Sequence, residues 1–243
     1  MSSLTEQQNE KNKEVDIEIT IDRSGSMSSQ GDAPTTGLYE FLLQQKENAT
    51  GLTSVSLTTF DDSVEYPWKV DDIKKDPLPD KDTMSIWIEP RGSTRLIDTA
   101  IERLKAQKDR AGDKKRIFVL LTDGQDNVSR NRTPQMNKAL REARSAGVAC
   151  IFLGSNQDAI TCGQQYGFSP DLCLSTSSAP ERAAIGYRAC SQVVTRAINS
   201  DPLTSVGFTG TERNMSAPDV LITDTVCTRP LSTHRNLTMS QPY

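Results

Sequence analysis

The stretch Ile17-Glu18-Ile19-Thr20-Ile21-Asp22-Arg23-Ser24-Gly25-Ser26 decides how the rest of the chain is interpreted. Its three isoleucines sit two positions apart, which is typical of a packed β-strand rich in β-branched side chains. The strand ends at Asp22, and Ser24 and Ser26 follow on either side of Gly25, whose backbone freedom allows a tight turn. The sequence therefore predicts a strand that delivers one carboxylate and two hydroxyls to a single loop.

Carboxylate and hydroxyl oxygens gathered in one loop suit a hard divalent cation. Mg²⁺ takes near-octahedral oxygen ligands at ~2.0–2.1 Å, and Mn²⁺ shares its ligand preference. One loop cannot complete such a site, and two later turns offer more oxygen: Thr94 in a Gly-Ser-Thr turn, and Asp123 after the apolar run 116–121. Right-handed crossovers bring the carboxyl ends of parallel strands to one rim, so we expect Asp123 to lie near Asp22.

The spacing of these residues resembles a known motif. It consists of five residues from three turns: Asp22, Ser24, Ser26, Thr94 and Asp123. Their order and their positions at strand ends resemble the metal-ion-dependent adhesion site of von Willebrand factor A domains, over about residues 15–200. The resemblance implies that the two serines bind the metal directly, that the threonine binds directly or through water, and that the two aspartates act mainly through water. It further implies Mg²⁺ or Mn²⁺ with one open position, which an exposed Asp or Glu of a protein partner completes.

The order of strands and helices predicts a doubly wound α/β fold. We expect a mostly parallel six-stranded sheet, Rossmann-like, whose central strand at residues 116–121 is buried on both faces. Residues 55–60 and 64–70 predict an antiparallel edge hairpin around a turn at Asp61. Residues 71–90 are expected to be surface loop. The longer helices are predicted at residues 35–47, 95–108, 134–146 and 180–198.

Composition limits the classes of function and the domain boundaries. The 243 residues carry a net charge of −4 and only 5% aromatic residues, which argues against nucleic-acid or anionic-membrane binding. Residues 1–14 form a polar tail without the features of a signal peptide, and no apolar run is long enough for a membrane span. Residues 201–243, rich in Ser, Thr, Pro and Asn, are expected to form an extended tail that contacts a larger assembly. A cytoplasmic protein of the intracellular or phage-like single-domain type is therefore expected.

Two alternatives to a non-enzymatic binding module remain open from the sequence. The first is a structural component of a phage or virus particle, in which the domain is a scaffold and the tails make lattice contacts. The second is a Mg²⁺-dependent phosphate-ester hydrolase with Asp22 as nucleophile, although such enzymes usually carry a second Asp where this chain has Ser24. A Ser-His-Asp triad is not expected, because the one histidine, His234, lies in the polar tail.

Four further residues flank the five. Arg23 and Arg95 are either ordinary exposed arginines or residues that attract an acidic partner. Gln125 and Asp126 either form a turn or support the metal ligands by hydrogen bonds. Five cysteines, none in a Cys-x-x-Cys pair, favour free thiols over a disulfide framework.

Overall fold

A computed structural model describes residues 14–155, 158–200 and 206–217 of the chain. Its centre is one sheet of six strands in the order β3-β2-β1-β4-β5-β6, in which only the β2–β3 pair is antiparallel. The strands are β1 (Val15–Asp22), β2 (Thr53–Phe60), β3 (Val64–Val70), β4 (Lys115–Thr122), β5 (Ala149–Ser155) and β6 (Cys173–Thr176). The predicted fold class is thus confirmed, including the antiparallel edge hairpin.

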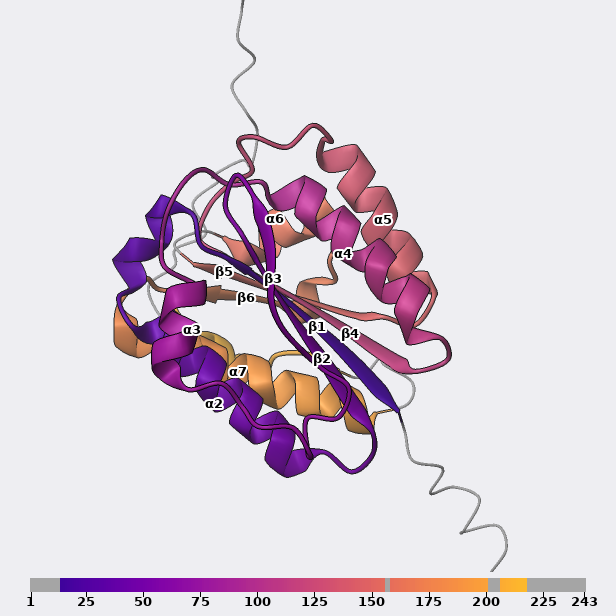
Figure 1. The fold of residues 1–243 in the computed structure, drawn as a ribbon. Helices are drawn as coiled ribbons and strands as arrows, with labels where there is room; N and C mark the ends of the chain where they lie inside the picture. The colour runs from indigo at the N-terminus through magenta and orange to yellow at the C-terminus, as the bar shows by residue number, and fades with distance from the viewer. Residues whose placement is uncertain (1–13, 156–157, 201–205, 218–243) are drawn as a thin grey trace, which may run out of the picture.

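Helices cover both faces of this sheet (Figure 1). They are the 3₁₀ helix η1 (Gly25–Gln30), α2 (Ala33–Asn48), α3 (Lys81–Trp87), α4 (Leu96–Ala111), α5 (Thr133–Ser145), α6 (Ala159–Tyr166), the 3₁₀ helix η2 (Pro170–Leu172), α7 (Pro180–Asn199) and α8 (Gly210–Ser216). One apolar core lies between the sheet and α2, α3 and α7, and a second lies between the sheet and α4, α5 and α6. The sheet is therefore buried on both faces, as a parallel sheet requires.

The contact between α2 and α7 depends on a glycine. A Cβ added to Gly37 of α2 would stand 2.3 Å from the ring of Tyr187 in α7. Only a residue without a side chain allows the two helices to approach this closely. The aromatic ring then lies in the core that α2 and α7 share with the isoleucine face of β1.

Two helices lie where the sequence predicted loop or tail. In the expected loop 71–90, Asp80 caps α3 by accepting a hydrogen bond from the Thr83 backbone N–H at 2.7 Å, a start signal that the prediction overlooked. In the expected tail, the structure describes α8, which packs on α7 and β6. Its Arg213 donates to the carbonyl of Cys173 at 2.7 Å. The rest of the predicted tails lies outside the described residues.

The cysteines and the helices also bear on two other expectations. Cys150, Cys173 and Cys190 are buried free thiols, whereas Cys162 is disulfide-bonded, which differs from the expectation of free thiols alone. Burial raises the pKa of the Cys150 thiol to about 12, so this thiol stays protonated and unreactive.

Within the described part of the chain, no helix combines the length and apolar character that crossing a bilayer requires.

Candidate metal centre

Asp22 ends β1 at the carboxyl rim of the sheet, with its carboxylate buried beneath the loop that follows. One carboxylate oxygen accepts the Ser24 backbone N–H at 2.7 Å, and the other accepts the Thr122 hydroxyl at 2.5 Å. The loop after β1 and the last residue of β4 supply these two partners, because the two neighbouring parallel strands end at the same rim. The carboxylate is consequently held in one orientation from both sides.

The two serines connect this loop to the end of β4. The Ser24 and Ser26 hydroxyl oxygens are 3.1 Å apart, at the start of η1. The Ser26 hydroxyl also donates to Oδ1 of Asp123 at 2.7 Å. A continuous row of oxygen atoms therefore joins residues that are 97 positions apart in the sequence.

Thr94 reaches the same place from a third loop. Its backbone N–H donates to the Asn127 side chain at 2.9 Å, and its carbonyl accepts the Asn127 backbone N–H at 3.0 Å. A Cβ added to Gly124 would stand 3.6 Å from both the Thr94 hydroxyl and the Ser26 hydroxyl, so both oxygens lie beside this glycine. The structure thus brings all five predicted residues together at the carboxyl rim, while their role as metal ligands stays a prediction.

Asp22 and Asp123 form no ion pair with a cationic side chain among the described residues. Burial raises the pKa of Asp22 to about 6, although the hydrogen bonds from Thr122 and Ser24 oppose the change, and the nearby Asp123 raises it further. Burial also raises the pKa of Asp123, against the hydrogen bond from Ser26. A bound cation would relieve both carboxylates.

The donor set fits a hard cation better than a soft one. Throughout the described ranges, no three His, Cys, Asp or Glu side chains come together in a metal-binding cluster. The site instead combines two carboxylates with three hydroxyls, all of them oxygen donors of the type that Mg²⁺ and Mn²⁺ prefer. The fit therefore depends on neutral hydroxyl oxygens as well as on the two carboxylates.

Arg23, inside the motif itself, is a buried structural residue and is not available to attract a partner. Only 2% of its surface is exposed, and its guanidinium donates to Asp61 at 3.0 Å and to Glu65 at 2.9 Å. Arg91 donates to the same Asp61 oxygen at 2.8 Å. Hydrogen bonds from Ser63 and Arg91 hold the pKa of Asp61 well below its usual range despite burial. We call Arg23, Asp61, Glu65 and Arg91 the arginine–carboxylate network.

Backbone hydrogen bonds reinforce this network between the first and second loops of the site. The Arg91 N–H donates to the Arg23 carbonyl at 2.7 Å, and the Gly25 N–H donates to the Gly92 carbonyl at 3.2 Å. The Arg95 N–H donates to the Asp61 carbonyl at 2.8 Å. Asp61 therefore does more than form the hairpin turn predicted for it, because it fixes the loops that carry Ser24 and Thr94.

The start of α4 is tied to the loop after Asp123 by another buried aspartate. Asp98 accepts the backbone N–H groups of Arg130 and Asn131, each at 2.9 Å, and these bonds lower its pKa to about 2 despite burial. Arg95 pairs with Asp98 at 3.4 Å. Asp126 accepts the Ile97 N–H at 3.3 Å, so it supports the loops and does more than form a turn. The role of Asp98 was not predicted from the sequence, because its position in a helical pattern did not reveal the loop that covers it.

Comparison with known proteins identifies the family of this fold. The family model of the von Willebrand factor type A domain matches residues 16–171. Among solved structures, the pilus adhesin SpaC from Lactobacillus rhamnosus GG aligns with a TM-score of 0.61 at 16% identity over 78% of this chain and 31% of that one. Proximal thread matrix protein 1 from the mussel byssus, "with zinc occupied MIDAS motif", aligns with a TM-score of 0.54 at 16% identity over 76% and 46%.

A third match is similar to this chain over most of its own length. The SpRpn10 VWA domain aligns with a TM-score of 0.51 at 15% identity, covering 70% of this chain and 91% of that one. At such identities the likeness shows a shared fold alone, and the chain spans less than half of the adhesin and of the byssus protein. No curated protein sequence matches the chain. The family model nevertheless covers more than half of the residues, and the chain belongs to the von Willebrand factor type A domain family.

Proposed function

We propose that this domain binds a divalent cation, Mg²⁺ or Mn²⁺, at the carboxyl rim of its sheet and uses it to hold an acidic residue of a protein partner. The residues proposed to hold the cation are Asp22, Ser24, Ser26, Thr94 and Asp123. The single observation that carries the proposal is the row of oxygen atoms from Ser24 through Ser26 to Asp123, beside a buried and unpaired Asp22.

The proposed site contains few negative charges for a divalent cation. When bound, the cation supplies a positive charge and an open coordination position. Ser24 and Ser26 contribute neutral oxygens, and only two carboxylates neutralise the charge of the cation. The site therefore keeps a net affinity for one more carboxylate, which an exposed Asp or Glu of a partner provides.

The comparisons support a role in binding and add no sign of catalysis. Solved structures with this fold include the pilus adhesin SpaC, the pili tip protein Mfa5 and a byssus matrix protein, and the last is described with a zinc-occupied MIDAS motif. For this chain, zinc joins Mg²⁺ and Mn²⁺ as a cation to test. A partner with an exposed Asp or Glu, a cytoplasmic location and a place in a virus particle stay predictions.

Cation binding is the direct test of the proposal. Titration calorimetry of the full chain with MgCl₂, MnCl₂ and ZnCl₂ should show binding to one site, and Ser26→Ala should weaken it by about tenfold or more. Ser29→Ala is the matched control, because Ser29 is an exposed serine of the same short helix outside the motif. Equal binding by all three proteins would refute the assignment.

The two alternative functions have separate tests. Turnover of p-nitrophenyl phosphate that requires Mg²⁺ and Asp22 would establish the hydrolase, and sedimentation of the pure chain as a large assembly would favour the particle component. No contact among the described residues favours either of them over the binding module. Proteins retained by the immobilised chain in Mg²⁺ and released by a chelator are the expected outcome of the proposal.

A further inference from the structure

Helix α5 and the loop before it carry a concentration of positive charge. Residues 130–146 contain five arginines and lysines and a single carboxylate, in a chain whose net charge is −4. The apolar side of α5 packs into the core that it shares with α4 and α6, and its other side faces outward at the margin of the molecule (Figure 1). Lys138, Arg141 and Arg144 are exposed and follow one another at intervals of three, which places them on one side of the helix. We call these three residues the α5 basic face.

The cations of the α5 basic face are not balanced by carboxylates. Several arginines of other helices are paired, and Arg196, for example, lies 2.9 Å from Glu212. Within the described ranges, no carboxylate pairs with Arg141 or Arg144. Lys138 has only a contact of 3.9 Å with an exposed glutamate one turn along the helix, and such a pair contributes little. The face therefore presents positive charge that is available to a partner.

A hollow with an apolar lining opens beside this face. It lies between the end of α5, the start of β5 and η2, and its volume is about 510 Å³. Its apolar lining includes three side chains that are at most 8% exposed: Val148, Leu172 and Val206. Arg141 and Arg144 also line it, and Arg144 donates to the Gly167 carbonyl at 2.8 Å, which fixes its guanidinium. Arg141 lines a second hollow together with Lys138, so the cations and the apolar surface are contiguous.

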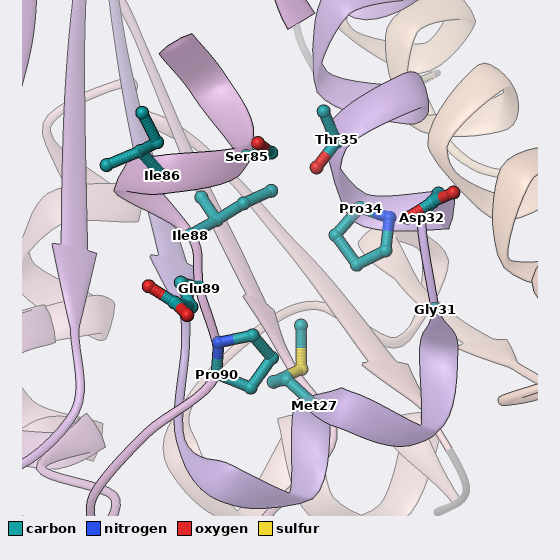
Figure 2. A pocket seen from close by; sticks show the side chains of 10 residues that line it. All are labelled: Met27, Gly31, Asp32, Pro34, Thr35, Ser85, Ile86, Ile88, Glu89 and Pro90. Atoms are coloured by element: carbon teal, nitrogen blue, oxygen red, sulfur yellow. The ribbon is translucent and has the colours of Figure 1, made fainter. Parts of the chain in front are cut away.

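The pocket between α2 and α3 differs from this hollow in charge. Among the described residues that line it, only Asp32 and Glu89 are charged, and Figure 2 shows both carboxylates pointing away from its centre. It therefore offers apolar surface without a cation. The hollow at α5 combines its apolar lining with two arginines and one carboxylate, Asp171. A ligand that has both negative charge and an apolar group thus fits the hollow at α5 and not the pocket between α2 and α3.

We propose that the α5 basic face binds an acidic segment of a protein partner, with an apolar side chain of that segment in the hollow and its Asp or Glu residues beside Arg141 and Arg144. The hollow lies at the amino ends of the strands, whereas the candidate metal centre lies at their carboxyl ends. The two surfaces are separate, so this inference goes beyond the proposed function and does not depend on a cation.

The chemistry of the surface favours a peptide over a nucleic acid. A nucleic acid gains its affinity mainly from contacts between cations and phosphates. Here the buried lining is apolar, and the Asp171 carboxylate would repel a continuous row of phosphates. None of the described aromatic side chains lines either hollow, so bases find no stacking partner there. A peptide can place acidic and apolar residues next to each other, and it thereby matches both parts of the surface.

The test uses a displayed library of random short peptides, selected on the full chain in a chelator so that the candidate metal centre does not contribute. We expect selected peptides to combine Asp or Glu with a large apolar residue. Such a peptide should bind Lys138→Glu/Arg141→Glu about tenfold more weakly than the unaltered chain. It should bind Asp171→Asn about twofold more tightly, because the variant removes a repulsive charge from the hollow. Alanine in place of the apolar residue of the peptide should weaken binding about tenfold.

The matched control is Lys105→Glu/Lys108→Glu, which reverses two exposed charges at the same spacing on α4. It should bind the peptide as the unaltered chain does. A selection without acidic residues, equal binding by Lys138→Glu/Arg141→Glu, or no gain with Asp171→Asn would overturn the proposal. Binding of a short DNA duplex that is lost in Lys138→Glu/Arg141→Glu would overturn it in favour of a nucleic acid. Because every arm contains the chelator, none of these outcomes bears on the proposed function.

Discussion

The two ends of β1 differ in whether their buried carboxylates are paired with arginines. Asp16, Glu18 and Asp22 alternate along one face of this strand, and they are 3%, 0% and 1% exposed. At the amino end, one nitrogen of Arg110 lies 2.8 Å from Asp16 and 2.8 Å from Glu18, and Arg103 lies 3.1 Å from Glu18. At the carboxyl end, Asp22 receives one N–H and one hydroxyl and no cation from the described chain.

The difference indicates where the domain requires something that it does not itself supply. A buried carboxylate is costly unless it is paired, and α4 provides the arginines that pair with the amino-terminal two. At the rim, even Asp61 has Arg23 and Arg91. Asp22 thus stands out from the buried acids around it without reference to any motif, which is independent support for a cation at that end.

The largest expected effect comes from removing the internal cation at the amino end. Arg110→Met should lower the free energy of unfolding by about 3 kcal/mol, because it leaves Asp16 and Glu18 buried with fewer counter-charges. Urea denaturation at pH 7 measures this loss, and added MgCl₂ should not restore it. Arg91→Met is the comparison, since Arg91 is 54% exposed and should cost under about 1 kcal/mol. Equal losses would show that burial does not distinguish the two arginines.

The opposite sign is expected at the carboxyl end. In a chelator at pH 7.5, Asp22→Asn should raise the free energy of unfolding by about 1–2 kcal/mol, because it removes an unpaired buried charge and keeps an oxygen for the Ser24 N–H. In MgCl₂ the same variant should gain nothing from the cation. Paired denaturation curves with and without Mg²⁺ measure both effects. Destabilisation in the chelator would mean that the ionised carboxylate is already compensated.

Lowering the pH should weaken cation binding at the carboxyl end of β1. Because the pKa of Asp22 is raised from 3.8 to about 6, a proton competes with the cation below that pH. We expect Mg²⁺ to bind about tenfold more weakly at pH 5 than at pH 7.5 in calorimetric titrations.

Without a cation, the same shift acts on stability with a definite sign. The folded state holds the Asp22 proton more tightly than the unfolded state does, so its contribution is present below about pH 4 and is lost as the pH rises through about 6. Asp22→Asn should abolish that part of the slope. An unchanged slope in the variant would assign it to other groups.

The smallest effect on stability is expected at the surface of the site. Ser26→Ala removes the hydroxyl that bonds Asp123, yet Ser26 is exposed, so the free energy of unfolding should change by no more than about 0.5 kcal/mol. Thermal denaturation in a chelator measures it. A large loss would show that the hydroxyl has a structural role, and the weakened cation binding expected of this variant would then be indirect.

The features that could be predicted from the sequence are those that a local pattern of residues determines. The isoleucines of β1 and the run before Asp123 revealed buried strands, and the motif placed five polar residues at strand ends. The short helix α3 was missed because it buries few side chains of its own. Pairing between distant residues was missed as well: Arg23, inside the motif, was expected at the surface, and its partners Asp61 and Glu65 follow 38 and 42 positions later.

The same limit applies to the polar face of β1. Asp16 and Glu18 occupy alternate positions in a strand whose isoleucines fill the other face, a pattern that usually indicates a half-exposed strand. Their partners on α4 are 85 and 94 residues away, so nothing near them in the chain shows that they are buried. Only the packed structure reveals which carboxylates are matched and which is left over.

The close approach of Gly37 to Tyr187 has a practical consequence for anyone who shortens this protein. The family match ends at residue 171, before β6 and α7. A fragment that ends there would lack Tyr187 and would expose the apolar face of α2. It would also leave β5 as an unprotected edge strand. Such a fragment should precipitate on expression, so recombinant work on the rim should use all 243 residues.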